Sequence, residues 1–183
     1  MKNINWKANQ GLLKDAIAKL GIERLLVHAD SFKSLSFIDF DENEDENLKK
    51  HVALITSLAP SVAIPAFNYD FPKTRFFNFD DFLSQTGSIA HAFCLKHSKK
   101  TFDPMFSLSY TSGHESFSEY RMFVNSYDSM GIFSNFTSAK SSILFYGAGI
   151  KTAWSMHYVE AMADVVYRYR KKFSGECMFE GVK

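Results

Sequence analysis

Three short apolar runs, separated by stretches of helical character, constrain the fold of this chain more than any other feature. They cover residues 25–27, 62–67 and 142–146, and a polar or glycine-containing loop follows each one. Runs of this length bounded by turn residues indicate buried strands. Because helices lie between these strands, the order predicts a layered α/β domain.

The stretches between these runs predict helices. Residues 6–20 repeat apolar side chains at helical spacing, and Gly21 follows as a natural end. An acidic segment, residues 41–47, precedes residues 48–55, and negative charge suits the start of a solvated helix. Shorter patterns predict helices over residues 87–95 and 152–165, and strands over residues 105–110 and 166–173.

Bulk composition is that of a folded protein and excludes several functional classes. A length of 183 residues suits one domain, and 46% hydrophobic with 22% charged residues argues against disorder. The net charge of +1 gives no strong field to attract nucleic acid or an acidic membrane. No apolar stretch resembles a signal peptide or a membrane span. We therefore expect a single cytoplasmic domain over residues 1–183, with neither nucleic acid nor membrane as a partner.

Cysteine and histidine spacing favours neither disulfides nor a metal site. Cys94 and Cys177 fit no Cys-x-x-Cys pattern, so reduced thiols are the simpler interpretation. His51, His91, His97 and His114 show no ligand spacing, and we predict no metal.

The residue pair most indicative of chemistry is His157 and Glu160. A three-residue offset on a helix places both side chains on one face. A carboxylate there can hold the imidazole in one tautomer, as a general base acting on an amine requires. The same spacing also occurs on many surface helices, so the pair alone is equally compatible with a plain surface contact.

Five short motifs, in order along most of the chain, resemble the aminoglycoside 3-N-acetyltransferase family. The opening helix ends in Leu20-Gly21-Ile22, and a strand then leads to His28. A Gly-leading helix at residues 87–93 and a Gly-rich turn before the His-x-x-Glu helix follow in the same order. The remaining matches are residues 64–69, where the family has Pro-Thr-Phe and an aromatic residue, and residues 100–107, where it has Arg-Ser-x-His-Pro-x-x-Ser.

The chain departs from that family at positions that indicate a particular branch. Lys100-Thr101 stands for Arg-Ser, Asp103 for the His before Pro, and Ala29-Asp30 for Ser-Ser. With residues 166–169 and 172–175, these departures look more like the branch that acetylates nucleotide-linked amino sugars for surface polysaccharides. The resemblance places an aminoglycoside-modifying, antibiotic-resistance role second.

The resemblance implies a layered α/β/α antibiotic N-acetyltransferase-like domain with a mixed central sheet. It also implies an acetyl-transfer activity. Acetyl would pass directly from acetyl-CoA to an amino sugar, without a covalent enzyme intermediate and without a metal. His157 would act as general base and Glu160 would orient it. The implied coenzyme contacts are His28, Asp30, Ser31, Lys100, Thr101 and Ser107, and the implied acceptor contacts are Asn68, Tyr69 and Asp103.

Each of these implied contacts has a structural alternative. The hydroxyls and carboxylates would serve equally as loop hydrogen bonds, caps or turn residues. His28 would serve equally as a buried histidine satisfied by the backbone.

Relatives of this kind usually continue beyond the position that matches Lys183, so we expect the family's C-terminal portion to be missing. A naturally short member, a truncated reading frame and an excised fragment all remain open. A non-catalytic relative that binds a ligand is therefore the alternative to an enzyme. An exposed aromatic patch at such an end would favour a homo-oligomer, which stays a hypothesis.

Overall fold

A mixed four-stranded sheet lies at the centre of the computed structural model, which describes residues 5–111 and 125–179. The strand order is β4-β2-β1-β5. The central strand β1 pairs in parallel with both β2 and β5, and β4 runs antiparallel to β2. The bounds are β1 Arg24–Ala29, β2 Ser61–Pro65, β4 Leu108–Tyr110 and β5 Ser141–Tyr146. The predicted α/β class and mixed sheet are confirmed.

Alternating side chains along the strands pack into two separate apolar clusters, one on each face of the sheet. Leu25 and Val27 of β1 belong to one apolar cluster, whereas Leu26 between them belongs to the other. This is the two-residue period of a strand that is covered on both faces. Burial on both faces explains why the runs of β1 and β2 are continuously apolar, whereas β5, at the edge of the sheet, is mostly half-buried.

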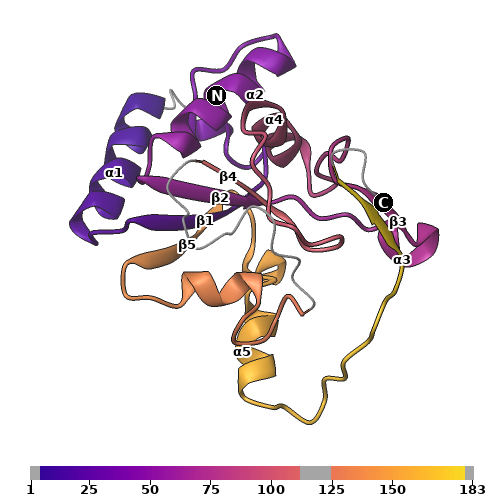
Figure 1. The fold of residues 1–183 in the computed structure, drawn as a ribbon. Helices are drawn as coiled ribbons and strands as arrows, with labels where there is room; N and C mark the ends of the chain where they lie inside the picture. Colours follow the sequence, from indigo (N-terminus) through magenta and orange to yellow (C-terminus); the bar gives the residue numbers. More distant parts are fainter. Residues whose placement is uncertain (1–4, 112–124, 180–183) are drawn as a thin grey trace.

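Helices cover both faces of the sheet. On the first face lie α1 Trp6–Lys19, α2 Glu44–Thr56 and α4 Ser88–Lys96, whose apolar residues join the first cluster. On the second face lie the 3-10 helix η2, Ile132–Phe136, and the segment around α5, Met156–Met162. Figure 1 shows α1, α2 and α4 on one side of the sheet and α5 on the other.

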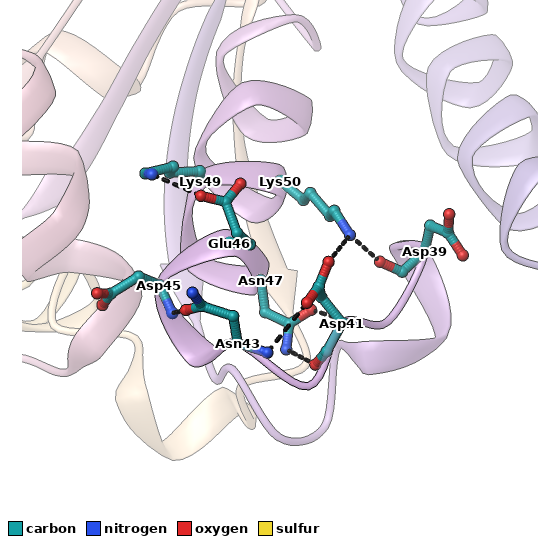
Figure 2. A network of polar contacts seen from close by, with 8 residues as sticks. All are labelled: Asp39, Asp41, Asn43, Asp45, Glu46, Asn47, Lys49 and Lys50. Carbon is teal, nitrogen blue, oxygen red and sulfur yellow. Dashed lines mark hydrogen bonds and ion pairs between the residues drawn. The ribbon is translucent and has the colours of Figure 1, made fainter.

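Polar contacts fix the start of α2 (Figure 2). The Asn43 side chain accepts a hydrogen bond from the Asp45 amide at 2.9 Å, which caps the helix. The buried Asn47 side chain makes two bonds to the backbone of Asp41, which also pairs with Lys50 at 3.2 Å. Acidic residues fill the first turn, as the charge order predicts.

A second, smaller sheet lies beside a cluster of phenylalanine side chains. It pairs β3 Phe76–Asn78 in parallel with β6 Glu176–Met178, next to the short helix α3 Phe71–Thr74. Phe79 stacks on Phe102 with ring centroids 4.5 Å apart. These rings form a third apolar cluster, so core packing accounts for them.

Two sequence predictions in the last third of the chain are wrong. Residues 166–173 form no strand, because Val166 is fully exposed and Tyr169 is 84% exposed, so this segment has no partner strand and no burial to hold it extended. The helix predicted over residues 152–165 is shorter. It is preceded by the 3-10 helix η3, Ile150–Thr152, and ends before Asp164, which has a left-handed φ of 48°.

Candidate active site

A cavity of about 310 Å³ opens at the carboxyl ends of the parallel strands. Ligands of open α/β sheets bind in this crevice, because the loops that follow neighbouring strands converge there. Its lining comes from the ends of β1 and β2, the start of α4 and the loop between β5 and α5. The residues are His28, Ala29, Ile64, Pro65, Phe67, Tyr69, Gln85, Thr86, Gly87, Ala90, Ala148, Thr152 and Trp154.

His28 forms part of the cavity wall at the end of β1. Its ring stacks on Phe145 of the neighbouring strand at 5.6 Å, and the residue is 4% exposed. Burial lowers its pKa to about 4, so the ring is neutral near pH 7. Its Nε2 has no hydrogen-bond partner, although buried polar atoms normally find one.

Trp154 contacts both the cavity and His157. The indole lines the cavity, and its ring centroid lies 5.2 Å from the His157 ring in an edge-on arrangement. Phe67 packs against the indole at 5.6 Å and Tyr69 at 6.5 Å. His157 is not among the residues that line the cavity, so its imidazole lies one side chain away.

α5 places His157 and Glu160 in contact. Nδ1 of His157 lies 2.8 Å from Oε2 of Glu160, and their side chains are 29% and 20% exposed. When Glu160 is ionised, Nδ1 must carry the proton, which leaves the lone pair on Nε2. This is the tautomer that a general base needs.

Two further side chains contact the same carboxylate. Arg168 Nη2 lies 2.8 Å from Oε2, and the Tyr167 hydroxyl donates to Oε1 at 3.2 Å. The hydrogen bond from His157, followed by the bond and charge of Arg168, lowers the pKa of Glu160. Glu160 is therefore an anion across the neutral range.

The structure brings some of the implied coenzyme residues to the cavity and holds others elsewhere. His28 lines the cavity, and the Ser31 hydroxyl accepts a bond from Ser88 at the start of α4, next to the cavity residue Gly87. Asp30 instead pairs with Lys33 at 3.1 Å.

Lys100, Thr101 and Ser107 use their polar atoms in contacts within the protein. Lys100 Nζ donates to the carbonyls of Phe79 and Phe82. The Ser107 hydroxyl donates to the Thr101 carbonyl, and the Thr101 hydroxyl accepts from the Leu108 amide. None of the three is among the cavity-lining residues.

Of the implied acceptor residues, only Tyr69 lines the cavity, and it is 44% exposed. Asn68 accepts a bond from the Asp70 amide at 2.9 Å. Asp103 is buried and accepts bonds from the Met105 and Phe106 amides at 2.8 Å and from Ser126, and burial raises its pKa. Both side chains shape turns.

Sequence reasoning missed several residues of this region. Trp154, Thr152, Gln85 and Thr86 line the cavity. The only sequence signal was their position beside the two glycine-containing turns, at Gly87 and Gly147. No sequence pattern indicated that Arg168 contacts Glu160, because Arg168 lies beyond the end of α5.

Within residues 5–111 and 125–179, no group of three or more His, Cys, Asp or Glu side chains is placed to hold a metal ion. His114 lies outside those ranges. In the same ranges, no helix has the length and apolar character needed to cross a membrane.

Comparisons with known proteins give one structural likeness. No family model matches the chain, and no curated protein matches it. The fold is similar to the solved structure of sisomicin-bound AAC-VIa, an aminoglycoside acetyltransferase, with a TM-score of 0.58 and 13% identity. The alignment covers 83% of this chain and 64% of the AAC-VIa chain. The chain therefore has an antibiotic N-acetyltransferase-like α/β fold.

Proposed function

We propose that this protein is an acetyl-CoA-dependent N-acetyltransferase that acts on an amino sugar, with His157 as the general base. The observation that carries the proposal is the contact chain from cavity to carboxylate. Trp154 lines the cavity and packs on His157, which bonds to Glu160. The likeness of the fold to an acetyltransferase solved with sisomicin bound supports the same chemistry.

The reaction needs one proton transfer and one nucleophilic attack. His157 Nε2 accepts a proton from the neutral attacking amine, while Nδ1–H stays bonded to Glu160, and later returns this proton to the leaving sulfur. The amine nitrogen bonds to the thioester carbonyl carbon, whose oxygen becomes a transient oxyanion. The C–S bond then breaks, and the coenzyme leaves as the thiol once the amine's proton has been transferred.

The cavity offers the features that an acetylated pantetheine arm needs. Its walls are mainly apolar and aromatic, and Gln85, Thr86 and Thr152 add a few hydrogen-bonding groups. Gly87, the N-cap of α4, lines the cavity, so a helix start borders it. His28 is neutral and lines the cavity, although its unpartnered Nε2 is itself buried.

The finer substrate class rests on motif resemblance. Residues 100–107, 166–169 and 172–175 look like the branch that acetylates nucleotide-linked amino sugars, so we propose such an acceptor first. Sisomicin in the similar structure favours an aminoglycoside as the second candidate.

Two assays test the proposal on the full chain. Acetyl-CoA should raise the melting temperature, since a ligand that binds only the native state stabilises it. Acetyl-CoA should then release free thiol when nucleotide-linked amino sugars or aminoglycosides are added. Stabilisation without thiol release from any acceptor would identify a ligand-binding relative instead of an enzyme.

Replacing His157 gives the first specific prediction. We expect His157→Ala to lower kcat by about 10²–10⁴-fold, the usual contribution of a general base, while acetyl-CoA still stabilises the protein. His91→Ala is the matched control, because His91 is exposed on α4. Near-normal turnover in His157→Ala would remove His157 from the mechanism.

A further inference from the structure

Glu160 carries more hydrogen bonds than the orientation of one histidine requires. His157 and Arg168 both contact Oε2 at 2.8 Å, and Tyr167 contacts Oε1 at 3.2 Å. Two donors, one of them permanently positive, therefore share a single carboxylate oxygen. The negative charge available to His157 is smaller than an unshared carboxylate would offer.

A turn at the end of α5 makes this arrangement possible. Asp164 adopts φ 48°, and the Val165 amide bonds back to the Glu160 carbonyl at 3.3 Å, as in a left-handed helix cap. The reversed chain then returns Tyr167 and Arg168 to the helix. Val166 and Tyr169 are exposed, so apolar burial does not hold this segment.

We propose that Arg168 is a positioning residue. It fixes the Glu160 carboxylate and weakens the electrostatic stabilisation that this carboxylate gives to a protonated His157. This inference rests on the proposed acetyltransferase function. An imidazolium at His157 is stabilised by a full negative charge and less so by one that Arg168 already neutralises. Arg168 thereby weakens the preference of Glu160 for a protonated imidazole at His157.

Tyr167 also donates to Glu160, but as a neutral hydroxyl on Oε1, and the remaining groups that face the pair carry no charge. The rings of Trp154 and Tyr127 pack against His157 at 5.2 and 5.7 Å, and neither is charged at neutral pH. Burial, followed by the charge of Asp103, raises the pKa of the Tyr127 phenol further above neutrality. In the described part of the chain, Arg168 is the one cation that an ion pair joins to Glu160, apart from His157 itself.

The test compares Arg168→Met, Arg168→Lys and Arg170→Met. Arg170 is exposed and two residues away, so its variant loses the same charge without the contact. The first measurement is an NMR titration of the His157 imidazole in the full chain without substrates. The second is the pH dependence of kcat/KM for thiol release from acetyl-CoA with the acceptor that the wild type uses.

We expect Arg168→Met to move the His157 titration and the acid limb of kcat/KM to higher pH by about 0.5–1 unit, typical of one partly exposed charge. Activity at pH 6 should fall about threefold to tenfold, with a smaller change at pH 8. Arg168→Lys should restore most of the wild-type midpoint, because it keeps the charge.

The proposal is overturned if Arg168→Met and Arg170→Met titrate alike, or if Arg168→Met lowers activity equally at every pH. Because the NMR titration needs no turnover, it separates this proposal from the proposed function. A shifted midpoint in a protein that releases no thiol would sink the acetyltransferase while supporting the effect of Arg168 on His157.

Discussion

At the scale of single residues, the candidate site depends on side chains with unusual surroundings. His28 and His51 are both buried and neutral, and each has an Nε2 without a partner. His51 Nδ1 bonds to the Tyr146 hydroxyl at 2.8 Å in the core, whereas His28 borders the cavity. The same residue type thus lies within the core at one position and in the cavity wall at the other.

Trp154 is the residue that connects the cavity to the proposed base. We expect Trp154→Leu to lower kcat/KM at least about tenfold, because His157 loses the ring that sets its position. Trp6→Leu, at the start of α1 and remote from the cavity, is the control and should keep full activity. Equal activity of the two variants would show that the indole does not matter for catalysis.

At the scale of elements, the turns that follow the strands position the site. β5 ends at Tyr146, and Gly147 turns the chain with φ 74° close to the loop after β1. A Cβ at Gly147 would lie 2.8 Å from the Asp30 carbonyl oxygen and 3.0 Å from the Ser34 nitrogen. Close backbone approach here brings the β1 and β5 loops together at the cavity.

Gly147→Ala should therefore destabilise the protein by about 1–3 kcal/mol, from backbone strain and the clash with Asp30. Gly149→Ala is a close control, since Gly149 has a negative φ and open space at its Cβ. Urea unfolding of both variants measures the difference. Similar midpoints would mean that the turn relaxes without cost.

At the scale of the whole molecule, the two buried histidines couple stability to pH. Burial lowers the pKa of His28 and His51 from 6.5 to about 4. Since the unfolded chain takes up these protons first, their contribution is complete above pH 6.5 and is lost as pH falls from 6.5 toward 4. Each histidine accounts for about 3 kcal/mol of lost stability at pH 4.

The measurement is the free energy of unfolding in urea between pH 7 and pH 4.5. His51→Gln removes one of the two protons, so the slope between pH 5 and 6 should fall by about 1.4 kcal/mol per pH unit. His91→Gln, at an exposed position, should keep the wild-type slope. An unchanged slope in His51→Gln would mean that His51 is not buried as a neutral group.

The sequence alone determined the sheet strands, the main helices and the contact between His157 and Glu160. These features depend on local periodicity and on helical spacing, which neighbouring residues set. Only the tertiary structure decided the strand order, the cavity and the return of Arg168 to Glu160. The strand order and the cavity arise where segments distant in sequence meet, as Trp154 does with Phe67 and Tyr69, whereas Arg168 returns to Glu160 because the chain reverses at Asp164. Residues 166–173 failed as a strand for the same reason, because a strand needs a partner that its own sequence does not encode.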